Sequence, residues 1–182
     1  MRATVLAVVL AAGPASAGCF TADEMPEKAI YGTASVLEYL GRDGDVLTYR
    51  SGELTSRVKD GVWPLDHRSE TFNVDYQWDD PLPSLAEIAA SGGKARVDGQ
   101  KTEKGKASQP VAIEVEILGK QTLDWEDCRY QVVEFRKVVW LKGKKASEGV
   151  ILYAPDAMIS FRSESTEEDT GARYSYALTE LQ

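Results

Sequence analysis

The sequence is poor in the residues that most metal and catalytic sites need, since its 182 residues include one histidine and two cysteines. Zinc sites draw their ligands from several cysteines and histidines, and acid–base catalysis most often uses histidine. Long apolar runs are also missing, because no segment reaches the roughly 20 apolar residues of a transmembrane helix. The sequence therefore predicts no metal, no cofactor and no transmembrane segment.

Positive charge is scarce as well. The chain carries 21 lysines and arginines against 29 acidic residues, which gives a formal net charge of -8. An acidic protein has no electrostatic attraction to the phosphates of nucleic acids or to anionic lipid headgroups. The composition therefore predicts no nucleic-acid partner.

The N-terminus has the pattern of a secretory signal peptide. Arg2 precedes the uncharged, mostly apolar stretch 4–12, and the small residues Ala15, Ser16 and Ala17 suit a cleavage site. We therefore expect residues 1–17 to be removed. Residues 18–182 are then expected to form a single β-rich domain that is exported to the periplasm.

The two cysteines, Cys19 and Cys128, allow one disulfide. Exported proteins meet an oxidising environment, where an even number of cysteines indicates pairing. Acidic residues around Cys128 disfavour the thiolate that a reactive cysteine needs. A second interpretation stays open, because "SAGC" (16–19) partly resembles the lipoprotein motif whose cysteine is acylated and anchors the protein. An acylated Cys19 could not form the disulfide, so the two predictions exclude each other.

Short segments of alternating apolar and polar residues recur along the chain. Phe72, Val74, Tyr76 and Trp78 alternate with polar residues, and so do the apolar residues of 111–117. Tight turns join such segments without intervening helices, as in antiparallel meanders. The pattern predicts a mainly β fold, either a single antiparallel curved sheet or a partly open barrel.

One short helix is predicted within this fold. Ser84 and Glu87 have the spacing of a capping box, and Gly92 ends the apolar stretch that follows them. The polar segment 99–110 carries several lysines and is expected to be a mobile loop or a long hairpin connection.

The C-terminal part resembles a group of envelope proteins. "EVEILGKQTLDWEDCRYQVVEF" (114–135), "EGVILYAPDAMISFRSE" (148–164) and "YSYALTEL" (174–181) are similar to the strand layout of uncharacterised Gram-negative envelope proteins of the DUF3108 kind. The residues 153–155 carry most of this likeness. The resemblance implies a curved antiparallel sheet like that of lipoprotein-carrier (LolA-like) domains, an envelope location and no catalytic residue.

Aromatic residues are the best candidates for a binding surface. Tryptophan and tyrosine suit both ordinary cores and binding clefts, because each joins a large apolar ring to a polar group. They are predicted to lie in the core or to line an apolar groove on the concave face of the sheet. The candidate binding residues are Trp63, Trp78, Trp125, Trp140 and Tyr153.

Three other features could carry chemistry. His67 follows Asp66, and hydrolases use such pairs, but strand neighbours point to opposite faces and the sequence pairs no nucleophile with His67. We expect His67 at the surface. The "DTGA" stretch (169–172) matches the aspartic-protease tetrapeptide, but it is better explained as a hairpin turn. Lys137 and the lysines of 142–145 are expected to protect a strand edge and keep the protein soluble, or to dock an acidic partner or a phosphate.

Three hypotheses for the function follow. The first is an exported, non-catalytic periplasmic β-protein that binds an apolar small molecule or lipid, or an envelope protein partner. The second is a structural or interaction protein of the envelope, anchored through Cys19. The third is a hydrolase that uses His67.

Overall fold

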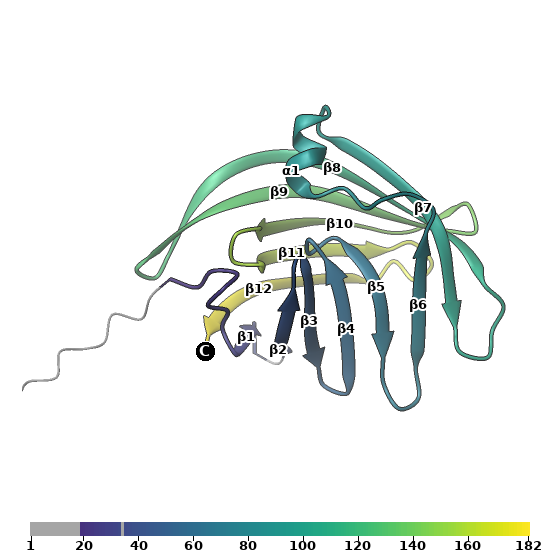
Figure 1. Cartoon of the computed structure of the whole chain (residues 1–182), viewed down its shortest axis with the longest axis horizontal. Coiled ribbons are helices and arrows are strands. Elements are labelled where there is room, and N and C mark those ends of the chain that lie inside the picture. The colour runs from purple at the N-terminus through teal and green to yellow at the C-terminus, as the bar shows by residue number, and fades with distance from the viewer. Residues whose placement is uncertain (1–18, 34) are drawn as a thin grey trace, which may run out of the picture.

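The computed structural model describes residues 19–33 and 35–182, so the predicted signal peptide lies outside the described residues. These residues form twelve strands and one helix (Figure 1). In chain order the elements are β1 (Lys28–Tyr31), β2 (Ser35–Asp43), β3 (Val46–Ser51), β4 (Leu54–Lys59), β5 (Trp63–Arg68), β6 (Asn73–Trp78), α1 (Leu85–Ala90), β7 (Lys94–Glu103), β8 (Gln109–Trp125), β9 (Cys128–Leu141), β10 (Lys144–Ala154), β11 (Ile159–Glu167) and β12 (Arg173–Leu181).

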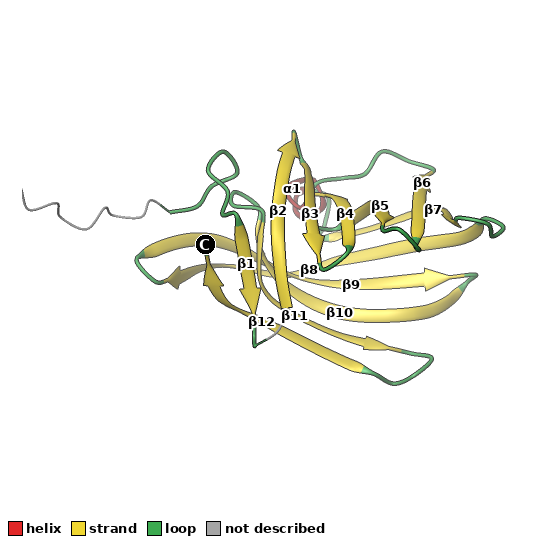
Figure 2. Cartoon of the chain, turned by 90° about the horizontal axis from the view of Figure 1, so that it is seen from below, coloured by secondary structure: helices red, strands yellow, loops and turns green. Residues whose placement is uncertain are grey.

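The strands form a closed antiparallel barrel (Figures 1 and 2). Each strand pairs with its neighbour in the sequence, and β1 pairs with both β2 and β12, which closes the ring. Among the described strands, none therefore keeps a free edge. The predicted mainly β fold with one short helix is confirmed, and the barrel is closed rather than partly open because β1 completes both edges of the sheet.

The two halves of the barrel differ in strand length. Strands β1 to β6 have 4–9 residues, whereas β7 to β12 have 9–17 and curve around the molecule (Figure 1). The segment 99–110 belongs mostly to β7 and β8, which pair through Gly99 and Val111, and only 104–108 connects them. The expected mobile loop and the expected long hairpin connection are both wrong for most of this segment, and the connection between the two strands is a short one at 104–108. Backbone pairing holds this segment in strands although its side chains are polar.

The helix α1 is held by its predicted cap. The Ser84 hydroxyl accepts from the Glu87 backbone N–H at 3.2 Å, and the Glu87 carboxylate accepts from the Ser84 backbone N–H at 2.7 Å. Leu85 and Ile88 are buried against the barrel core. In the part of the chain that the structure describes, no helix is both long and apolar enough to cross a membrane.

The buried apolar residues form two clusters. The cavity cluster surrounds the hollow part of the barrel and comprises Leu47, Val62, Trp63, Leu85, Ile88, Val97, Ile113, Val115, Val133, Phe135, Tyr153 and Met158. The stapled cluster lies near the β8–β9 turn and comprises Ala29, Tyr31, Tyr130, Val132, Leu152, Ala154, Ala157, Ile159, Phe161 and Leu178.

A disulfide joins Cys19 to Cys128, with their Cα atoms 5.4 Å apart. It ties the N-terminal arm to the start of β9. The arm then packs Phe20 against the stapled cluster, and the Ala22 N–H donates to the Asp156 carbonyl at 2.6 Å. The structure therefore contains the bridge that the cysteine count predicts.

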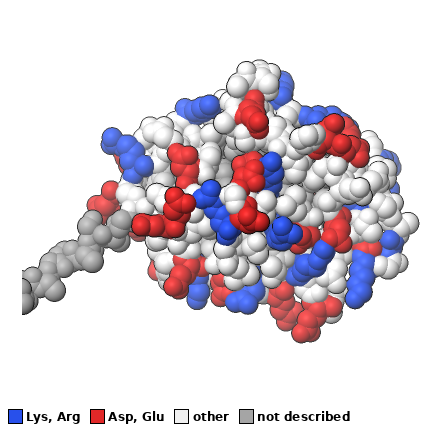
Figure 3. Space-filling model, in the orientation of Figure 1, with Lys and Arg blue, Asp and Glu red and all other residues white. Residues whose placement is uncertain are grey.

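The outer face of the barrel carries charges of both signs. Figure 3 shows them interspersed over one face, without a large area of a single sign. Many form ion pairs across adjacent strands, as Arg136 does with Glu116 and Glu148. Exposed pairs of this kind each contribute little to stability, about 0–1 kcal/mol.

Candidate functional site

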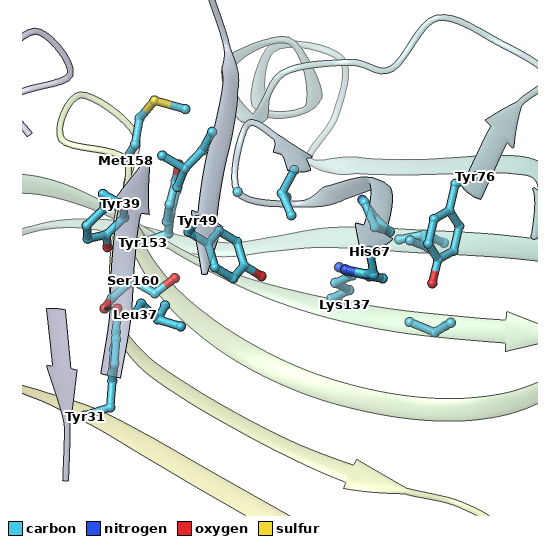
Figure 4. Close-up of a pocket in the computed structure, with 16 residues that line it drawn as sticks. Tyr31, Leu37, Tyr39, Tyr49, His67, Tyr76, Lys137, Tyr153, Met158 and Ser160 are labelled. Carbon is cyan, nitrogen blue, oxygen red and sulfur yellow. Dashed lines mark hydrogen bonds between the residues drawn. The ribbon is translucent and has the colours of Figure 1, made fainter. Parts of the chain in front are cut away.

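An interior cavity of about 290 Å³ lies within the barrel and is partly open to solvent. Side chains from most of its strands line it, and they are mainly aliphatic and aromatic with a few polar groups (Figure 4). The lining residues are Tyr31, Leu37, Tyr39, Leu47, Tyr49, Val58, Gly61, Pro64, His67, Tyr76, Ile113, Lys137, Val139, Tyr153, Met158 and Ser160.

Four tyrosines, Tyr31, Tyr39, Tyr49 and Tyr153, line one side of this cavity (Figure 4). Burial raises the pKa of all four, and that of Tyr39 to about 12, so each hydroxyl stays neutral at physiological pH. The Tyr31 hydroxyl donates to the Ser160 carbonyl at 2.8 Å. The Tyr153 hydroxyl is buried and has no hydrogen-bond partner among the described residues.

A glycine makes room for Tyr153. Gly61, in the β4–β5 turn, has a φ of 67°, which favours glycine. A Cβ added there would lie 2.5 Å from Cζ of the Tyr153 ring, which is closer than two non-bonded carbon atoms can approach. Gly61 therefore has two roles, because it allows the tight turn between β4 and β5 and it lets the tyrosine ring lie against that turn.

Lys137, on β9, points into the cavity on the opposite side from Tyr153 (Figure 4). Its ammonium donates to the Val62 carbonyl at 2.5 Å. Burial lowers the pKa of Lys137 to about 8, and no carboxylate of the described residues forms an ion pair that would offset this effect. The prediction that Lys137 protects an exposed strand is wrong, because it lies on the inward face with Phe135 and Val139.

His67 lies beside Lys137 inside the barrel rather than at the surface, which corrects the expectation. Its Nδ1 is 2.8 Å from the hydroxyl of the buried Ser56, which faces it across the β4–β5 pair. Burial and the nearby charge of Lys137 lower the pKa of His67, so the imidazole is neutral at physiological pH. Asp66 points to the other face, as strand alternation predicts, and pairs with Arg57 at 3.2 Å.

Of the five aromatic residues predicted to bind, Tyr153 lines the cavity and the four tryptophans lie elsewhere. Trp63 is fully buried in the cavity cluster, and its indole N–H donates to a backbone carbonyl at 2.8 Å. Trp78 packs beside it, with ring centroids 6.1 Å apart. Trp125 packs in the stapled cluster. Trp140 lies under an arginine side chain on the sheet, 5.8 Å from its ring centroid.

A second cavity, of about 380 Å³, lies next to the first. Ala22 of the N-terminal arm, Asp60 and Ser84 are among its lining residues. Tyr153 and Met158 line both cavities and therefore form the wall between them.

Sequence reasoning missed Ser56 and four of the five tyrosines that line the cavity. One signal for Lys137 was present, since it alternates with Phe135 and Val139, whose apolar side chains mark the inward face. Nothing comparable identifies Ser56, because its contact with His67 depends on how β4 and β5 pair.

Comparison with protein-family models and with curated proteins gives no match. Among solved structures, the hypothetical lipoprotein YmcC of Escherichia coli K12 is similar, with a TM-score of 0.54 and 10% identity over 87% of this chain and 89% of that chain. A putative exported protein with a YmcC-like fold from Bacteroides fragilis aligns with a TM-score of 0.39 and 13% identity over 90% and 92% of the two chains. The first likeness shows a shared fold. The resemblance to DUF3108 and LolA-like proteins stays a prediction.

Proposed function

We propose that this chain is an exported, non-catalytic binding protein that holds a small, largely apolar molecule inside its barrel. The observation that carries the proposal is the interior cavity, with its aliphatic and aromatic walls and a few polar groups. Its volume of about 290 Å³ is close to the lower end of the roughly 300–1,000 Å³ of small-molecule sites. Such sites combine apolar walls with a few polar groups that fix the orientation of the ligand.

Three features support a location in the cell envelope. The N-terminal sequence has the pattern of a signal peptide. The disulfide suits an oxidising compartment such as the periplasm. The E. coli protein with a similar fold is itself described as a lipoprotein. Because the Cys19 sulfur is bonded to Cys128, it has no thiol to acylate, and this favours a periplasmic protein without the lipid anchor.

Two alternatives remain distinct from this proposal. Binding of an envelope protein on the outer face would leave the cavity without a role. A hydrolase is favoured by one observation, the contact between Ser56 and His67. In serine hydrolases, however, the second imidazole nitrogen is oriented by a carboxylate, and here Asp66 pairs with Arg57 on the other face. Ester hydrolysis by the wild-type protein that Ser56→Ala abolishes would support the hydrolase.

Native mass spectrometry of the mature chain, purified from its own envelope fraction, tests the proposal. We expect a non-covalent adduct of small mass in the wild-type protein. Val139→Phe fills the cavity and should remove the adduct, whereas Val36→Phe makes the same change at an exposed position and should keep it. A bare wild-type chain, or an adduct that persists in Val139→Phe, would contradict binding inside the barrel.

A further inference from the structure

Lys137 is the one lysine or arginine among the described residues that line the interior cavity. Strand alternation places it there, since Phe135 and Val139 on either side also face inward. Lysine at such a position is uncommon, because a cation loses its hydration when it is buried and needs a partner in exchange. Its presence in the cavity lining indicates a ligand that offers hydrogen-bond acceptors or negative charge to Lys137.

The hydrogen bonding of Lys137 is incomplete. An ammonium group has three N–H donors, and the described residues accept one of them, through the Val62 carbonyl. No ion pair of the described residues involves Lys137, although many lysines on the outer face have a carboxylate partner. Two donors and one positive charge therefore face the cavity. An anionic ligand would supply both the acceptors and the compensating charge.

The other polar groups nearby limit how much negative charge the cavity can hold. His67 is neutral because burial and Lys137 lower its pKa, and burial raises the pKa of Tyr76 to about 12. One cation is thus surrounded by neutral groups. A phosphate monoester carries about -1.5 to -2 charges at neutral pH and would stay partly uncompensated, whereas a carboxylate carries one.

We propose that the molecule held in the barrel is a monocarboxylate with an apolar body, whose carboxylate binds the ammonium of Lys137. This rests on the proposed function and names the class of its ligand. The body of the ligand lies along the aliphatic wall formed by Leu47, Ile113 and Val139. The cavity volume of about 290 Å³ restricts it to a short chain or a single small ring system.

Isothermal titration calorimetry with octanoate and octanol tests this proposal, because the two probes share their apolar chain and differ in charge. We expect the mature wild-type chain to bind octanoate about 10- to 100-fold more tightly than octanol at neutral pH, as a hydrogen-bonded ion pair in a buried site would give. Lys137→Met should remove this preference and keep the binding of octanol. Lys144→Met, an exposed lysine on the neighbouring strand, should leave both affinities unchanged.

The possible outcomes separate the two proposals. Equal binding of octanoate and octanol, unchanged in Lys137→Met, would overturn the carboxylate proposal and leave the apolar binding function intact. Failure of both probes to bind the wild-type chain would overturn binding in the cavity as well. Retained octanol binding shows that Lys137→Met folds with its cavity intact, and Lys137→Gln serves as a second variant that must show the same loss of preference.

Discussion

The stapled cluster and the cavity cluster use aromatic residues in opposite ways. In the stapled cluster, Phe161 packs against Trp125 and Tyr130, with ring centroids 5.6 and 5.1 Å apart. Around the cavity, tyrosine rings such as Tyr153 line open space, and the hydroxyl of Tyr153 has no partner among the described residues. One barrel therefore combines a region that is filled by aromatic side chains with a region that leaves volume.

This difference separates stability from binding. Close packing and a covalent bridge stabilise the part of the barrel around Cys128. Lys137 and the empty volume of the cavity reduce the stability of the part around the cavity. Residues that lower the stability of a fold are expected at functional sites. Loss of a packed ring in the stapled cluster should therefore lower stability, whereas loss of the Lys137 charge should increase it.

The largest loss of stability is expected from Phe161→Ala. Phe161 is 4% exposed, and its removal leaves a cavity among aromatic rings. We expect the free energy of unfolding to fall by about 3–5 kcal/mol in urea denaturation. Phe72→Ala is the matched control, since Phe72 is 41% exposed and should change stability by less than about 0.5 kcal/mol. Similar losses in both variants would show that the stapled cluster is not specially stabilising.

The disulfide should have the next largest effect. Its cysteines are separated by 109 residues, so the bridge restricts a long segment of the unfolded chain. Combined Cys19→Ser and Cys128→Ser substitution should lower the free energy of unfolding by about 2–5 kcal/mol. A reducing agent should lower the melting temperature of the wild-type protein and leave that of the double variant unchanged. A wild-type melting temperature that does not change with the reducing agent would contradict a stabilising bridge.

Replacement of Lys137 should act in the opposite direction. Burial lowers its pKa to about 8 from an ordinary value of 10.5. Below about pH 8 both the folded and the unfolded chain carry the proton, and the folded chain bears the full cost of the buried charge. Between about pH 8 and about pH 10 only the unfolded chain keeps it, so wild-type stability should increase with pH.

Lys137→Met removes this buried charge. We expect the free energy of unfolding at neutral pH to increase by up to about 3 kcal/mol, and its increase from neutral pH to about pH 9.5 to disappear. Urea denaturation across this pH range measures both effects. The range ends below the ordinary pKa of tyrosine, about 10, because ionisation of unfolded tyrosines would lower stability above it. A variant less stable than wild type at neutral pH would show that Lys137 is not under strain from burial.

Local patterns in the sequence predicted the local features of this structure. The capping box at Ser84 and the cysteine pair depend on neighbouring residues and on a count, respectively. The site depends on pairing between distant strands, and a shift of register between Arg57 and Val58 decides which residues face one another on β4 and β5. Lys137 was misjudged because lysine is usually exposed, although its alternation with apolar residues indicated the inward face.

The smallest effect is expected from removing the hydroxyl of Tyr153. Because this hydroxyl has no partner among the described residues, Tyr153→Phe removes a buried unpaired group and should change the free energy of unfolding by less than about 0.5 kcal/mol, or increase it. Tyr31→Phe makes the same change where the hydroxyl donates to the Ser160 carbonyl at 2.8 Å, so it should cost about 1–2 kcal/mol. Thermal or urea denaturation of the two variants makes the comparison directly. Equal costs would mean that Tyr153 has a partner in the folded protein, most simply the molecule that the cavity binds, and removal of that molecule by refolding from urea should then restore the difference.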